Sequence, residues 1–206
     1  MTLSNRTRRV RLAAAIGLAA LTIIPASAQM PMARMGETEM RAMLAGWPMS
    51  AQMAAADMMK KYGPPQEMTA TMLKWHNNGP WKYTMISNYE TPHRFPMPHP
   101  DVMEQAIDYR VPTAMFDDLA AYDGSVTVDR TQGHLAARCD KEAANFLAIN
   151  LAHDVVTRRK SVPAARAYYA RAISTYMKTK RMDPYMQMLQ FTPPRSANDP
   201  DMPAKM

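Results

Sequence analysis

The 206-residue chain has one cysteine, few aliphatic residues and none of the common catalytic signatures. Because Cys139 is its only cysteine, an internal disulfide is excluded. The glycine-rich phosphate loop, the Gly-x-Ser-x-Gly turn of hydrolases and the His-Glu-x-x-His pair of zinc proteases do not occur. The sequence therefore specifies no reaction, and it favours a binding or interaction protein over an enzyme.

Long apolar runs are also missing, since no segment after Ile24 approaches the ~20 residues that a membrane-spanning helix needs. The run over 12–24 is shorter than that, follows four arginines and ends at Ala26-Ser27-Ala28. This pattern predicts a secretory signal peptide over 1–28, cleaved near Ala28, and a periplasmic or secreted protein with no transmembrane segment. Thr7-Arg8-Arg9 matches the twin-arginine export signal in part, so both export routes stay open.

An excess of basic charge is largely a property of this leader. The formal charge of +7 includes four leader arginines, and the remaining chain has 21 basic and 18 acidic residues. A balance this even is not the electrostatic footprint of a nucleic-acid-binding protein. We expect no nucleic-acid partner, whereas a protein partner in the envelope stays open.

Periodicity and turn residues predict a single α+β domain over 48–180. Its fold class is a small antiparallel sheet of two hairpins with a C-terminal antiparallel helical hairpin. A Met-rich arm over 29–47, with a possible short helix at 37–45, precedes it, and a largely disordered tail containing proline and methionine over 181–206 follows. The predicted elements are a helix over 50–62, strands over 68–75 and 81–89, a helix over 115–122, strands over 126–128 and 134–138, and helices from Asp140 to about Val156 and from Ser161 onward.

Two segments of this domain are harder to interpret. Pro92, Pro96, Pro98 and Pro100 remove backbone donors, so 91–100 is predicted to be an extended loop. The segment 103–111 fits both a helix and a strand, and we interpret it as a helix that turns into a strand.

Methionine is abundant where aliphatic residues are scarce. After the leader there are 21 methionines against seven Leu, four Ile and seven Val, so some methionines must fill the core. Thioethers also favour Cu(I), which makes a periplasmic copper binder one hypothesis. The clusters that suggest it are Met30-x-Met32-x-x-Met35, Met40-x-x-Met43 and Met186-x-Met188.

The proline segment holds a candidate metal site. His93, Met97, His99 and Asp101 offer two imidazoles, a thioether and a carboxylate that could hold copper or zinc. An extended chain of ~3 Å per residue would separate the two histidines by roughly 20 Å unless it folds back. The competing interpretation is that Phe95 and the prolines pack while the histidines stay solvated.

Cys139 is a weak catalytic candidate because it precedes a predicted helix, whose positive end lowers the pKa of a thiol. A thiol enzyme would also need a base. His134 is expected on the opposite face of its strand and His153 about four turns along the helix, so a partner would have to come from 93–99. The alternative is a buried, inert thiol. Glu142, Asn145 and His153 share a helix side that could line a pocket or simply bond to neighbouring loops.

Several segments between 47 and 169 resemble a family of uncharacterised exported bacterial proteins. They are Lys61-Tyr62-Gly63-Pro64-Pro65, Gly79-Pro80-Trp81-Lys82, His93-x-Phe95-Pro96-x-Pro98-His99-x-Asp101 and Ala137-Arg138-Cys139-Asp140-x-Glu142. The resemblance implies export and supplies no activity, cofactor or catalytic residue. The first segment is also similar to small envelope lipoproteins with a helix followed by a sheet, although the lipid-bearing cysteine is missing.

Overall fold

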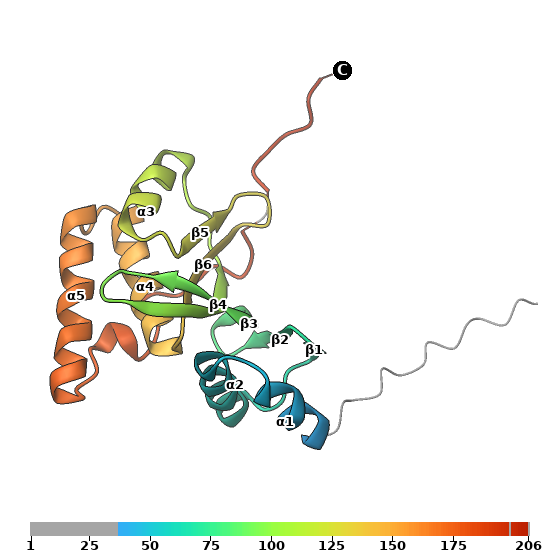
Figure 1. Cartoon of the computed structure of the whole chain (residues 1–206). Helices are drawn as coiled ribbons and strands as arrows, with labels where there is room; N and C mark the ends of the chain where they lie inside the picture. The colour runs from blue at the N-terminus through green and yellow to red at the C-terminus, as the bar shows by residue number, and fades with distance from the viewer. Residues whose placement is uncertain (1–36, 198, 206) are drawn as a thin grey trace, which may run out of the picture. The chain divides into compact units, whose positions relative to one another are not determined.

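A computed structural model describes residues 37–197 and 199–205. The predicted signal peptide and the cluster of Met30, Met32 and Met35 lie outside these residues. Figure 1 labels the elements, which are α1 Glu37–Ala45, α2 Met49–Tyr62, β1 Glu67–Thr69, β2 Met72–Asn78, β3 Trp81–His93, β4 His99–Asp108, α3 Phe116–Tyr122, β5 Val126–Asp129, β6 His134–Cys139, α4 Glu142–Val156 and α5 Val162–Thr179, with 3-10 turns η1 Thr113–Met115 and η2 Pro184–Met186. None of the helices in these ranges is long and apolar enough to cross a membrane.

The fold belongs to the α+β class, and its sheet is one antiparallel unit of six strands in the order β1-β2-β3-β4-β6-β5. The strand that joins the two expected hairpins is β4, so the prediction of a helix in 103–111 is wrong. Both Ala106 and Ile107 are fully buried, which means that the strand is covered on both sides. A strand of this kind lacks the alternation of polar and apolar residues by which strands are recognised.

The prediction of an extended loop over 91–100 is also wrong, because β3 continues to His93 and β4 begins at His99. Pro92 lies directly opposite Pro100. Residues opposite each other in an antiparallel ladder alternate between hydrogen-bonded and non-bonded pairs, and two prolines can share a non-bonded pair without leaving a donor unsatisfied. The proline-rich segment is therefore a hairpin, whose turn spans only 94–98.

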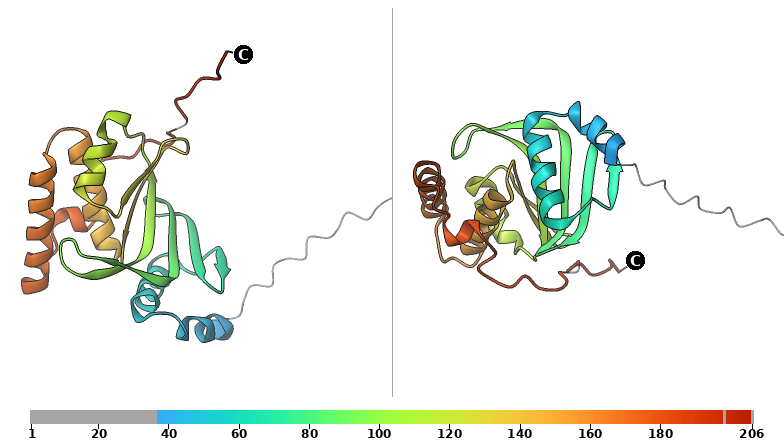
Figure 2. Two further views of the ribbon diagram at one scale, coloured as in Figure 1. Left: turned by 45° about the horizontal axis from the view of Figure 1, so that its top comes forward. Right: turned by 90° about the horizontal axis from the view of Figure 1, so that it is seen from below.

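Helices α2 and α4 cover the same face of the sheet, next to each other along it (Figure 2). The buried amide of Gln105 on β4 links them: its nitrogen lies 3.7 Å from Met58 Sδ on α2, and its oxygen accepts a hydrogen bond of 3.0 Å from Asn145 on α4. Helices α3 and α5 also pack against α4. The buried methionines among the described residues support the interpretation of methionine as core filler; they are Met58, Met103, Met115 and Met186.

The sequence predicts the cap of α5 correctly and that of α4 incorrectly. Ser161 caps α5 as expected, since its hydroxyl accepts a hydrogen bond of 3.3 Å from the Ala164 amide. Asp140 does not cap α4, which begins at Glu142 with Lys141 at the N-cap and no side-chain cap. The Asp140 carboxylate instead contacts Lys141 Nζ and the thiol of Cys139.

The chain after α5 packs against α4, in contrast to the predicted tail from 181 onward. Asn150, which is 1% exposed on α4, donates to the carbonyls of Tyr185 and Met188 and accepts from the Gln190 amide. Met186 is buried between these contacts. One helix side chain thus supplies the main-chain partners that this irregular segment needs, and no periodic pattern announces such an arrangement.

The turn between β2 and β3 gives the first prediction. Gly79 has a φ of +63°, and a Cβ there would lie 2.9 Å from the ring and hydroxyl of Tyr62. The φ of Gly63 is also positive, at +78°, but its ψ of −171° belongs to a region open almost only to glycine, so it is not a matched control. We expect Gly79→Ala to lower the free energy of unfolding by roughly 1–2 kcal/mol more in the wild-type background than in a Tyr62→Ala background, because only in the former must Tyr62 move. Urea titrations measure both losses, and equal losses would contradict this.

Candidate metal centre

The end of the β3–β4 hairpin brings His93, His99 and Asp101 together. His93 lies opposite His99 in the ladder and Asp101 lies two residues further along β4, so all three side chains point to one face of the sheet. The two imidazole rings are 4.9 Å apart between centroids. One ligand atom from each of the three residues lies within 4.8 Å of the others, a grouping that could hold a metal ion.

The carboxylate of Asp101 is the centre of this group. Its side chain is 2% exposed, although a carboxylate is costly to bury without partners. Oδ2 accepts a hydrogen bond from the Ser125 hydroxyl and lies 3.6 Å from His93 Nδ1. Oδ1 lies 3.3 Å from His99 Nε2 and accepts no well-aligned hydrogen bond from any described residue. The site therefore has a buried carboxylate with one oxygen that lies beside an imidazole but accepts no aligned hydrogen bond.

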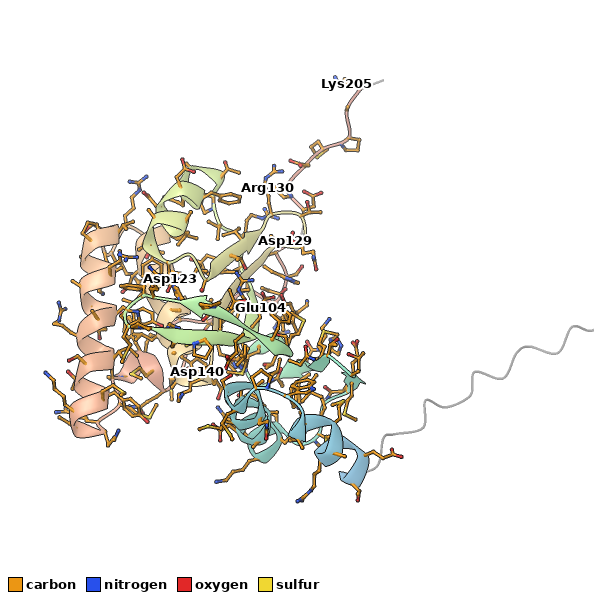
Figure 3. The ribbon with its side chains drawn as sticks, in the orientation of Figure 1. Glu104, Asp123, Asp129, Arg130, Asp140 and Lys205 are labelled. Atoms are coloured by element: carbon orange, nitrogen blue, oxygen red, sulfur yellow. The ribbon has the colours of Figure 1, made fainter. Side chains whose placement is uncertain are left out.

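Each histidine of the site is held on the side that faces away from the carboxylate. The Nδ1 atom of His99 lies 2.8 Å from the carbonyl oxygen of Met97. On His93, Nε2 lies 3.4 Å from Asp123 Oδ1, and Asp123 itself accepts from the Ser125 amide at 2.9 Å. Asp123 follows α3 at the start of the segment that leads into β5, as labelled in Figure 3. These contacts fix the orientation of both rings.

Cys139 lies beside the same group. It is opposite Met103 in the ladder between β4 and β6, and its thiol is near enough to the His99 imidazole for each group to shift the pKa of the other. The side chain is buried, and burial raises the pKa of the Cys139 thiol above its ordinary value. The Asp101 carboxylate, followed by the Cys139 contact, raises the pKa of His99 to about 11. In the absence of a metal ion, His99 is thus a cation paired with Asp101.

The hairpin turn is fixed to the helical layer. Phe95 packs on Tyr169 of α5, with ring centroids 5.3 Å apart, and the guanidinium of Arg166 lies 3.9 Å from the centre of the Phe95 ring. Arg166 also donates a hydrogen bond of 2.6 Å to the Tyr122 carbonyl oxygen. Figure 1 shows the hairpin reaching across to α5. The turn that joins the two histidine-bearing strands is therefore fixed to α5.

Three of the four predicted metal ligands are brought together, and Met97 is not one of them. Its side chain is 44% exposed, and its contribution is the carbonyl oxygen beside His99. The expected separation of roughly 20 Å between the histidines does not apply, because the chain folds back between them. Of the competing interpretation, the packing of Phe95 is confirmed, whereas the histidines are largely withdrawn from solvent, with side chains that are 17% and 16% exposed.

Two residues of the site, Asp123 and Ser125, were not predicted. The sequence indicates only a helix end at Asp123-Gly124. Asp and Ser are ordinary turn residues, so their types at this point carry no signal for a metal site. Only the packing of the α3–β5 connection over the hairpin places them beside His93.

The helix side with Glu142, Asn145 and His153 forms bonds instead of lining a pocket. Glu142 Oε1 accepts hydrogen bonds from the Tyr62 hydroxyl at 2.6 Å and from Trp81 Nε1 at 2.7 Å. Asn145 bonds to Met103 and Gln105, and His153 bonds to the Tyr109 hydroxyl while its ring stacks on Phe191. Glu142 and His153 are thus bonded within the fold, and Asn145 donates two hydrogen bonds while its buried Oδ1 accepts none.

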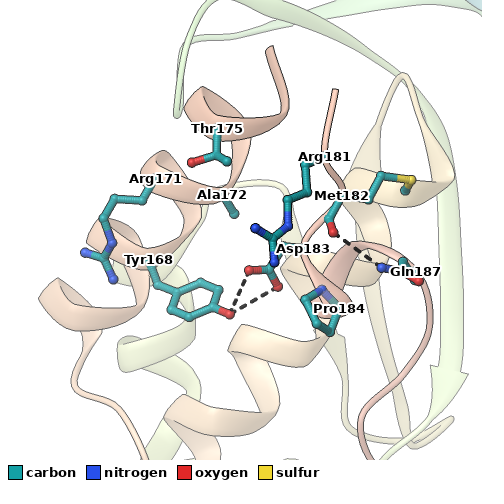
Figure 4. Close-up of a pocket in the computed structure, with 9 residues that line it drawn as sticks. All are labelled: Tyr168, Arg171, Ala172, Thr175, Arg181, Met182, Asp183, Pro184 and Gln187. Carbon is teal, nitrogen blue, oxygen red and sulfur yellow. Dashed lines mark hydrogen bonds between the residues drawn. The ribbon is translucent and has the colours of Figure 1, made fainter. Parts of the chain in front are cut away.

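A separate cavity of about 510 Å³ lies between α5 and residues 181–187 (Figure 4). Arg171 and Arg181 line it but are exposed, and the Asp183 carboxylate already accepts from the Tyr168 hydroxyl at 3.1 and 3.0 Å. The cavity therefore lacks buried polar groups that converge on a ligand.

Comparisons with protein-family models, with curated proteins and with solved structures gave no match, so the site itself has to carry the functional argument.

Proposed function

We propose that this protein binds one divalent transition-metal ion, best matched by Zn²⁺, through His93, His99 and Asp101. The observation that carries the proposal is the buried Asp101 carboxylate with two imidazoles beside it and one oxygen without an aligned hydrogen bond. Ligand atoms about 2.0–2.2 Å from a tetrahedral zinc ion lie roughly 3.5 Å from one another. The distance of 3.3 Å between His99 Nε2 and Asp101 Oδ1 already meets this requirement.

The surroundings of the three residues support the same function. Histidine ligands of metal ions usually donate their second ring N–H to a carbonyl or carboxylate, which sets the tautomer and orientation of the ring. The Met97 carbonyl oxygen stands in that position for His99, and the Asp123 carboxylate does so for His93. The Ser125 hydroxyl holds the carboxylate ligand. Each ligand thus has an outer partner suited to metal binding.

The donor set favours Zn²⁺ over the Cu(I) of the methionine hypothesis. Imidazole and carboxylate suit borderline divalent ions, whereas Cu(I) prefers soft sulfur donors. The thioether that would have made the set softer belongs to Met97, whose side chain is 44% exposed. The copper hypothesis would have to rest on methionines elsewhere in the chain.

We also propose that the protein works after export, as a binding protein and not as a thiol enzyme. The leader sequence supports the periplasm or the exterior as its location. Cys139 is 5% exposed, and burial raises its pKa, which is the opposite of an activated nucleophile. Neither the cavity beside α5 nor a second cavity, lined by residues such as Tyr109 and Arg130, includes His93, His99 or Cys139 in its lining.

Titration calorimetry of the chelator-treated protein with Zn²⁺ tests the proposal. We expect one ion per chain for the wild-type protein, and an affinity reduced by about 100-fold or more in His93→Ala, because removal of one first-sphere ligand should cost at least as much as loss of an outer partner. His76→Ala is the matched control, since His76 also pairs with a carboxylate, that of Glu67, but both are exposed. Wild-type protein that takes up no Zn²⁺, or equal losses in the two variants, would refute the proposal.

A further inference from the structure

We propose that the Cys139 thiolate is a fourth ligand, so that the ion is held by one sulfur, two nitrogen atoms and one oxygen atom. This inference rests on the proposed function, because it completes the same site. It assigns a role to a buried thiol that takes part in no disulfide.

The backbone geometry of two strands places the thiol correctly. Alternate residues of β4 point to one face, so His99, Asp101 and Met103 share it. Cys139 on β6 lies directly opposite Met103, and residues opposite each other in a ladder share a face. Cys139 is therefore a diagonal neighbour of Asp101, about 7–8 Å away along the sheet, a separation that these two short side chains can bridge only through an ion between them. Strands β3, β4 and β6 thus each supply a ligand to one face.

The side chains converge at His99. Its Nε2 lies 3.3 Å from Asp101 Oδ1, and the ring interacts with the Cys139 thiol. The sulfur is not among the ligand atoms that lie within 4.8 Å of one another, so the thiol must turn toward them to complete the site. The unbonded oxygen Asp101 Oδ1, on a side chain that is 2% exposed, lies next to the same ring. This buried oxygen is a second sign, independent of the cysteine, that the space between the residues suits a cation.

The thiol is free to coordinate. Its hydrogen bond to Asp140 Oδ1 is long, at 3.5 Å, so little is lost when the sulfur turns away. On coordination the S–H bond of Cys139 and the Nε2–H bond of the protonated His99 both break, each ligand atom keeps the electron pair that forms its bond to the metal ion, and the two protons pass to solvent. No oxidant or reductant is needed. A donor set with a thiolate excludes the hard ions Mg²⁺ and Ca²⁺ and retains Zn²⁺ and Co²⁺.

Substitution of Co²⁺ for Zn²⁺ tests the fourth ligand separately from the site. Co²⁺ bound by thiolate gives a sulfur-to-metal charge-transfer band in the near ultraviolet, in addition to its visible ligand-field bands. We expect both in the wild-type protein, and in Cys139→Ser the loss of the near-ultraviolet band with the visible bands retained. The wild-type spectrum is decisive by itself if the variant fails to fold by circular dichroism.

The outcomes separate the two proposals. Bound Co²⁺ without a charge-transfer band would overturn the assignment of Cys139 and leave the proposed function intact. If the wild-type protein binds neither Co²⁺ nor Zn²⁺, the proposed function fails and the fourth ligand fails with it.

A second measurement uses the reaction of Cys139 with a small neutral thiosulfonate. We expect Zn²⁺ to slow it at least tenfold in the wild-type protein and to leave it unchanged in Asp101→Asn. Equal rates with and without Zn²⁺ in wild-type protein that binds the ion would contradict sulfur coordination.

Discussion

Asp101→Asn should abolish the stabilisation that Zn²⁺ gives to the wild-type protein. An ion that binds only the folded state at 100 times its Kd raises the free energy of unfolding by about 2.7 kcal/mol. The asparagine keeps the shape of the side chain but loses the negative charge that offsets the charge of the ion. Urea unfolding of both proteins, with Zn²⁺ and with chelator, measures this gain, which we expect to be near zero in the variant.

Ser125→Ala provides the matched control, because it removes an outer partner that Asp101 and His93 share and removes no ligand. Loss of such a partner typically weakens metal binding by about 10- to 100-fold, so part of the gain should persist when Zn²⁺ is in excess. Asp101→Asn will also destabilise the metal-free protein, since it removes the carboxylate paired with His99. The quantity to compare is therefore the free energy of unfolding with Zn²⁺ minus that with chelator, determined for each protein separately. An equal gain in wild type and Asp101→Asn would show that zinc binds elsewhere.

The parts of the fold that the sequence predicts are those whose signals are local. The alanine and methionine face of α2 follows the helical period, and Ser161 is a cap of the usual kind. Strand β4 escapes prediction because its environment is not local: neighbouring strands flank it and both of its faces are covered, so its residues show no alternation. The packing of 181–191 on Asn150 is equally invisible, since it depends on one amide of α4.

The candidate site also has one part that the sequence predicts and one part that it does not. Its ligand types could be read directly, because His93, His99 and Asp101 lie within nine residues of sequence. Their convergence could not, because it depends on a hairpin whose strands contain prolines at a non-bonded pair. Cys139 is 40 residues from His99, and only the pairing of β4 with β6 shows that the two side chains meet.

Glu142 joins three parts of the molecule that are far apart in the sequence. It lies in the first turn of α4, where the helix dipole favours a negative charge. Its carboxylate accepts from Tyr62 at the end of α2 and from Trp81 at the start of β3, and it pairs with Lys61 at 2.5 Å. The Glu142 side chain is 10% exposed, and Trp81 is 1% exposed. Water therefore cannot readily replace the carboxylate.

Glu142→Ala should lower the free energy of unfolding by about 3 kcal/mol, because it leaves the buried Trp81 N–H and the Tyr62 hydroxyl without their acceptor. Glu142→Gln retains an acceptor oxygen and loses the charge, so it should cost roughly half as much. Glu90→Ala is the control: Glu90 accepts from Ser50 at 2.6 Å in an exposed pair, and its loss should change stability by less than ~0.5 kcal/mol. Urea titrations of the three variants test the expected order, in which Glu142→Ala loses the most stability, Glu142→Gln loses about half as much and Glu90→Ala loses the least. If Glu142→Ala is as stable as the control, the carboxylate does not hold α2, the β2–β3 turn and α4 together, because the donors it leaves behind must then have found other partners.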